Sequence, residues 1–122
     1  MAGLEVKSVS SPEETRPFQD EKGEVHVVNV HGQPVLHGVF EPGWRWSEHV
    51  KPIAGTDSCQ VAHVGYVLSG RMTVRMDDGS EHEYKPGEAF NMPPGHDAWV
   101  EGDEQCVLVD FGGLHGYAQA SG

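Results

Sequence analysis

Positively charged side chains are scarce in this sequence. Its 122 residues carry 8 Lys and Arg against 19 Asp and Glu, which gives a formal net charge of −11 at pH 7. A surface this acidic repels the phosphate backbones of nucleic acids and the headgroups of anionic lipids. We therefore expect neither nucleic acid nor a membrane among the partners of the protein.

Long apolar runs and cysteines are also few. No apolar run approaches the ~20 residues that a membrane-spanning helix needs, and residues 1–17 are polar, without the apolar core of a signal peptide. We expect a cytoplasmic protein. In that compartment the two cysteines, Cys59 and Cys106, normally stay reduced, and a disulfide between them is the alternative.

Convincing helical periodicity is absent, and short strand-like runs take its place between turns rich in glycine and proline. Residues 71–76 alternate in the manner of a half-buried strand and lead into the hairpin signal Asp77-Asp78-Gly79. Residues 60–68 are apolar at both parities, which predicts a strand buried on both faces. Eight to ten such strands predict an all-β sandwich or barrel.

The length fits one domain. We expect an N-terminal arm or leader over residues 1–22, a barrel over residues 23–115 and a C-terminal tail over residues 116–122. An arm of this kind and the edge strands of an open sheet both favour pairing between copies, so we also expect a homodimer.

Two segments resemble the two sequence motifs of the cupin superfamily. The first ends in residues 65–70, with the sequence GYVLSG. The second covers residues 86–96, where Gly87, Pro93 and Gly95 match the family's G-x5-P-x-G spacing. The resemblance extends over about residues 43–102 and implies a double-stranded β-helix, or jelly-roll barrel.

The resemblance also indicates where metal ligands are expected, although this sequence departs from the usual set of two histidines, a glutamate and a later histidine. Counting back from Gly70, His63 stands at the glutamate position, Cys59 at the second histidine and Asp57 at the first. A different count, from Gly43, makes His49 the first histidine. The two counts conflict because residues 50–58 read as an inserted loop.

The second motif departs from the family as well. Its expected histidine position holds Ala98, and His96 stands two residues earlier. Residues two apart in a strand share a face, so His96 points to the side where the ligand is expected. Two alternatives follow: the site binds a metal through shifted ligands, or it has lost its metal.

The residues that we predict as metal ligands are His49, Cys59, His63 and His96. Imidazole and thiolate donors favour a divalent transition metal, with zinc or iron the first choices. Three ligands leave a coordination position open for substrate, whereas four close the site. The alternatives are a hydrogen-bonded core histidine at His63, a turn-capping residue at His96, and a small buried apolar residue at Cys59.

A pocket beside this site is predicted from aromatic and polar residues. Three indoles in a small domain are consistent with a pocket for a flat or apolar ligand, and ordinary core packing is the alternative. An aspartate next to His96 is a candidate to orient a ligand imidazole, and a tyrosine in the apolar strand is a candidate proton donor. The predicted pocket residues are Trp44, Trp46, Tyr66, Asp97 and Trp99.

Three functions are compatible with this site. The first is a metal-dependent enzyme that acts on a small organic molecule, of the oxygenase, isomerase or cyclase type that the resemblance implies. The second is a non-catalytic barrel that binds or senses a small molecule without metal. The third is a metal-free structural barrel, and the fold alone does not choose among them.

Overall fold

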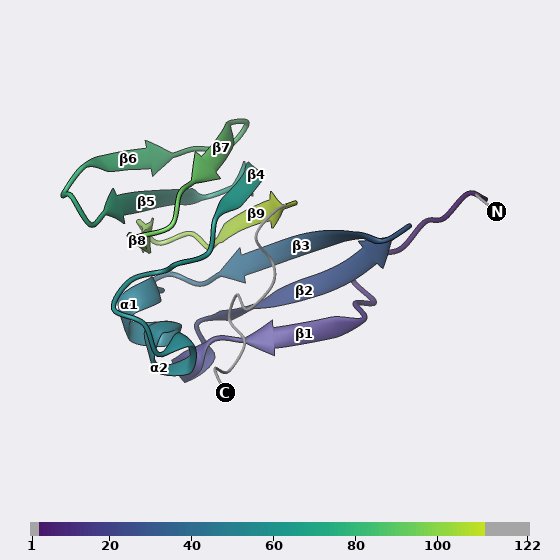
Figure 1. The fold of residues 1–122 in the computed structure, drawn as a ribbon, viewed down its shortest axis with the longest axis horizontal. Helices are drawn as coiled ribbons and strands as arrows, with labels where there is room; N and C mark the ends of the chain where they lie inside the picture. The colour runs from purple at the N-terminus through teal and green to yellow at the C-terminus, as the bar shows by residue number, and fades with distance from the viewer. Residues whose placement is uncertain (1–2, 112–122) are drawn as a thin grey trace.

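The computed structural model describes residues 3–111, which fold into two antiparallel β-sheets (Figure 1). The larger sheet has the strand order β1-β2-β3-β9-β4-β7. Its strands are β1 (Glu14–Pro17), β2 (Gly23–Val30), β3 (Gln33–Phe40), β4 (His63–Ser69), β7 (Ala89–Met92) and β9 (Cys106–Asp110). The smaller sheet has the order β6-β5-β8, formed by β5 (Arg71–Met76), β6 (Glu81–Tyr84) and β8 (His96–Glu101). The predicted all-β sandwich is confirmed.

The core lies between the two sheets, where alternate side chains of each strand point inward. Both sheets contribute buried apolar side chains to it. The larger sheet supplies Val25, Leu36, Val67 and Leu108, and the smaller sheet supplies Met72, Val74, Ala98 and Val100. Burial of each such apolar side chain contributes roughly 1.5–3 kcal/mol before conformational entropy is counted. Cys59 and Cys106 are both buried and unbonded to each other, so the disulfide alternative is wrong.

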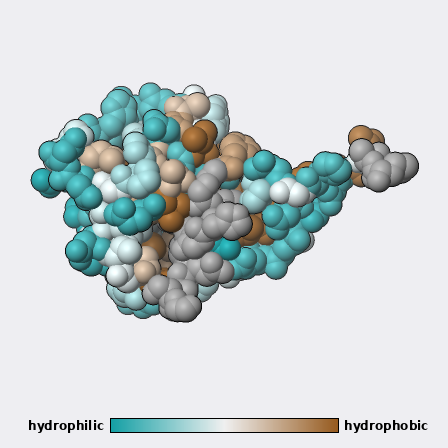
Figure 2. Space-filling model, viewed as in Figure 1, coloured by the Kyte–Doolittle hydropathy of each residue, from teal (hydrophilic) through white to brown (hydrophobic). Residues whose placement is uncertain are grey.

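The prediction that residues 60–68 are buried on both faces is wrong for one face. His63, Gly65 and Val67 are buried, whereas Val64, Tyr66 and Leu68 are exposed, with Tyr66 at 41%. The smaller sheet covers only the inner face of the larger sheet, so the outward-pointing residues of β4 lack a covering layer. On the side seen in Figure 2, most of the surface is hydrophilic and apolar residues gather near its centre.

Three short helices were not predicted, and one of them lies in the segment 50–58 that we expected to be a loop. The single turns α1 (Trp46–His49) and α2 (Lys51–Ala54) follow β3, and a 3-10 turn, η1 (Gln19–Glu21), precedes β2. Pro52 is compatible with the first turn of α2, and Gly55 ends that helix with φ +78°. The helices were missed because each is too short to show a helical periodicity.

Part of the predicted N-terminal arm forms the edge strand β1, which pairs with β2 over residues 14–17. β2 and β3 continue as a long hairpin that projects to one side in Figure 1. The predicted C-terminal tail, residues 116–122, lies outside the described residues. Within residues 3–111, no helix is long and apolar enough to cross a membrane.

Candidate metal centre

Three of the predicted ligands, Cys59, His63 and His96, meet inside the barrel. One donor atom from each residue lies within 4.8 Å of the other two, and all three residues are buried. The Cys59 Sγ to His63 Nε2 distance is 3.7 Å, and the two imidazole rings lie 5.5 Å apart at an angle of 69°. Such a cluster has the size and donor set of a transition-metal site.

The backbone brings these residues together from both sheets. His63 is the first residue of β4 and His96 is the first residue of β8. Cys59 lies outside the strands, but its N–H donates to the His96 carbonyl at 2.7 Å, and the Gly95 N–H donates back to the Cys59 carbonyl at 2.7 Å. Gly95 has φ +90°, a conformation that a glycine adopts readily. This corner therefore fixes Cys59 beside His96.

Asp110 fixes the orientation of the His63 ring. This aspartate is the last residue of β9, and register places it opposite Gly65 on β4. Its carboxylate accepts a short hydrogen bond from His63 Nδ1–H, with both side chains buried. The proton is thereby held on Nδ1, which leaves the Nε2 lone pair directed at the cluster. A carboxylate behind an imidazole is the usual support for a metal-binding histidine.

His96 is held in the same tautomer by a backbone group. Its Nδ1–H donates to the Pro93 carbonyl at 2.6 Å, so the lone pair of this ring is on Nε2. Burial lowers the pKa of His96, although the bond to Pro93 acts in the opposite direction. The ring is therefore neutral near pH 7, which is the form that binds a metal.

Cys59 supplies the sulfur of the cluster. Burial raises the pKa of its thiol to about 11, so without a metal the sulfur keeps its proton at pH 7. The sulfur lies 3.7 Å from His63 Nε2, and the Val61 carbonyl, 3.9 Å away, accepts from the thiol. A metal ion that binds here takes the place of this proton, because the thiolate is the form that binds metals.

The cluster opens onto an apolar cavity between the sheets. Its polar lining comes from His63, His96 and Asp110, and its volume is about 20 Å³. That volume is close to the space needed by one water molecule. The apolar lining residues are Leu36, Phe40, Trp44, Trp46, Met72, Phe90, Met92, Ala98 and Leu108.

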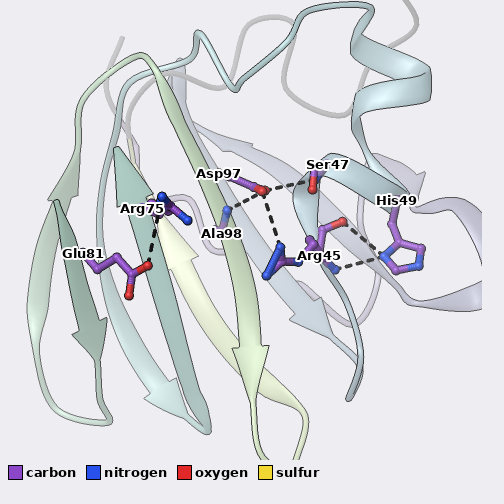
Figure 3. A network of polar contacts seen from close by, with 7 residues as sticks. All are labelled: Arg45, Ser47, His49, Arg75, Glu81, Asp97 and Ala98. Carbon is purple, nitrogen blue, oxygen red and sulfur yellow. Dashed lines mark hydrogen bonds and ion pairs between the residues drawn. The ribbon is translucent and has the colours of Figure 1, made fainter. Parts of the chain in front are cut away.

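The fourth predicted ligand, His49, is not part of the cluster. Its Nδ1 accepts the Arg45 N–H at 2.9 Å, and its Nε2 lies 3.8 Å from a carboxylate oxygen of Asp20. Figure 3 shows this ring turned back onto the first turn of α1. His49 therefore ends a helix instead of binding the site, and the count from Gly43 was misleading because α1 ends at His49 and α2 lies in the inserted segment 50–58. Asp57 is also absent from the cluster and lies 3.7 Å from Lys51 at the surface.

Three of the predicted pocket residues lie elsewhere, whereas Trp44 and Trp46 do line the cavity. Tyr66 is on the exposed face of β4. Trp99 faces away from the cavity and carries the Arg45 guanidinium 4.3 Å above its ring.

Asp97 does not orient an imidazole. It accepts hydrogen bonds from the backbone N–H groups of Ser47 and Ala98 at 3.0 and 2.9 Å, and it faces Arg45 at 3.9 Å (Figure 3). Asp97 therefore anchors the beginning of α1 to β8.

Asp110 is a residue of this site that neither the predicted ligands nor the predicted pocket residues include. A signal for it is present in the sequence. In the run Cys106–Asp110 every second residue, Cys106, Leu108 and Asp110, is buried, so the aspartate falls on the core-facing parity of an apolar strand. A carboxylate in that place needs a partner, and His63 is the partner that the structure supplies.

Comparisons with known proteins identify a family. A family model described as "Cupin domain" matches residues 54–112, a range that contains all three cluster residues and Asp110. No curated protein matches the chain.

Solved structures with similar folds share little sequence with this chain. A protein of unknown function from Acinetobacter sp. ADP1 has a TM-score of 0.60 and 17% identity, covering 82% of this chain and 90% of its own. A cupin-like protein from Thermotoga maritima has a TM-score of 0.52 and 20% identity, covering 77% and 71%. KdgF from a Halomonas species has a TM-score of 0.52 and 19% identity, covering 76% and 81%. At these identities the likeness extends to the fold alone.

Proposed function

Since this chain belongs to the cupin superfamily, we propose that it is a metal-dependent enzyme that acts on a small organic molecule, by oxygenase, isomerase or cyclase chemistry. The observation that carries the proposal is the buried cluster of Cys59, His63 and His96. The Nδ1–H groups of both imidazoles are already hydrogen-bonded, to Asp110 and to the Pro93 carbonyl. The two rings and the Cys59 thiol therefore form a preorganised set of metal donors.

The donor set fits a divalent transition metal, with zinc or iron our first choices. Nitrogen and sulfur donors favour such ions over magnesium and calcium. Three protein ligands leave a coordination position free, as catalytic sites require. When bound, the ion supplies a Lewis acid that polarises the group placed at that position. The protein residues hold the geometry: Asp110 orients His63, Pro93 orients His96 and the Gly95 corner places Cys59.

The cavity favours a particular way of binding. Its apolar walls suit an organic molecule, but its volume of about 20 Å³ leaves room for roughly one water-sized group. A substrate that follows this geometry places one small group beside the ion and keeps the rest of its body at the mouth of the cavity.

Cobalt(II) in place of the natural metal tests the proposal, because its visible spectrum reports on ligands. We expect the loaded protein to show a thiolate-to-cobalt charge-transfer band that is lost in Cys59→Ser. We also expect azide to change the cobalt spectrum by taking the open position. A charge-transfer band without any azide response would indicate a closed, structural site, and the absence of both would favour the non-catalytic barrel that binds small molecules without metal.

We also propose that two copies pair through the outer face of β4. Val64, Tyr66 and Leu68 are exposed there, and Tyr66 stands beside Val109 of β9 in the register. An uncharged strip is where two chains that each carry a net charge of −11 approach with the least repulsion. We expect sedimentation to give a species near 27 kDa, twice the 13.3 kDa of one chain. Leu68→Lys should shift it to the monomer, and a 13 kDa species for the wild-type protein at micromolar concentration would contradict the pairing.

A further inference from the structure

One buried polar atom in the cavity wall has no partner. The Trp44 Nε1–H lacks a hydrogen-bond acceptor among the described residues, and it is the one buried side-chain N or O atom there in that situation. Trp44 is 2% exposed, so water at the surface does not satisfy the group. Leaving an indole N–H without an acceptor costs roughly 1–3 kcal/mol.

The position of Trp44 gives a reason for keeping a buried N–H without an acceptor. Its indole lines the same cavity as His63 and His96. Phe18 and Phe40 pack against it at ring distances of 5.4 and 4.7 Å, and the Val100 N–H donates to its backbone carbonyl at 3.0 Å. The ring is therefore held on several sides by residues that offer no acceptor to Nε1. The cavity that the indole lines is the space left for an acceptor.

We propose that Trp44 Nε1–H is a ligand-binding donor, and that it holds the acceptor atom of the group placed at the open position of the metal. The inference rests on the proposed function, because that function supplies the open position. It assigns a ligand class: molecules that present a small anionic or carbonyl-type acceptor atom to the ion. An indole N–H donates and cannot accept, so the site discriminates against ligand groups that present only a donor.

Trp46 provides a matched control. It lines the same cavity and is equally buried, at 2% exposed, but its nitrogen is not among the buried atoms that lack a partner. Trp44→Phe and Trp46→Phe therefore make the same chemical change in the same cavity, and only the first removes a fully buried donor without a partner.

The test uses azide and the zinc-loaded protein, with the indole N–H signals of the three tryptophans followed by NMR. We expect azide to move the Trp44 signal downfield, identified by its absence in Trp44→Phe, and to leave the Trp46 and Trp99 signals in place. We expect Trp44→Phe to weaken azide binding about tenfold, the effect of one hydrogen bond, and Trp46→Phe to change it less than twofold.

The outcomes separate the two proposals. If azide binds but the Trp44 signal stays in place and Trp44→Phe binds as tightly as the wild type, the role of Trp44 is wrong while the open metal site stands. If azide does not bind to the loaded wild-type protein, the open position and the inference both fall. Where Trp44→Phe does not fold, the Trp44 signal is assigned by elimination from the spectra of Trp46→Phe and Trp99→Phe, and the measurement on the wild-type chain then decides the matter.

Discussion

Replacing His63 by alanine is expected to lower the affinity of the protein for zinc by about a hundredfold or more. The change removes one of three donors and also the hydrogen bond between His63 and the buried carboxylate of Asp110. Total binding free energies of structural zinc sites are about 10–16 kcal/mol, so each donor carries several kcal/mol. A competition titration against a chromophoric chelator measures the loss.

His82→Ala is the control for this experiment. His82 is exposed on β6, in the smaller sheet, and is not part of the cluster. Its removal should leave zinc affinity unchanged within about twofold. Equal affinities in His63→Ala and in the wild type would show that zinc binds elsewhere.

Alkaline pH is expected to destabilise the metal-free protein more than an ordinary domain of this size. Burial raises the pKa of Cys59 to about 11 and that of Cys106 to about 12, from the ordinary value of 9.0. In the unfolded chain both thiols lose their protons near pH 9, whereas in the folded chain they keep them. Between pH 9 and pH 11 the unfolded state therefore binds fewer protons, and the free energy of unfolding falls as pH rises.

The expected loss between pH 8 and pH 11 is about 2 kcal/mol for each thiol, measured by urea denaturation across that range. The double variant Cys59→Ala/Cys106→Ala should start less stable at pH 8 and lose far less on going to pH 11. A smaller slope remains in it because burial also raises the pKa of Tyr84. Parallel curves for the wild type and the double variant would show that the thiols are not shielded as the structure places them.

Much of the fold was predictable from local signals. These signals each extend over only a few residues, and the observed strands and turns agree with them. They are the alternation in residues 71–76, the turn at Asp77–Gly79 and the Gly87-Pro93-Gly95 spacing. The parity argument for His96 also holds, since His96 and Ala98 both line the cavity.

What the sequence could not supply was the arrangement of distant segments. His49 looked as suitable a ligand as Cys59 because both precede the same strand, and only α1 and α2 decide that His49 turns toward Asp20. Asp110 reaches His63 through the pairing of β9 with β4, a contact between residues 47 positions apart. Tyr66 and Trp99 were placed by residue type, whereas strand parity directs both away from the cavity.

The most direct test of the account is the metal content of the chain after metal loading and exhaustive dialysis. Elemental analysis of the purified wild-type protein should find one zinc or iron ion per chain, held by Cys59, His63 and His96. The same analysis of His63→Ala should find the ion lost. A wild-type protein that retains no transition metal under these conditions would contradict the metal centre, and the barrel would then be a metal-free one.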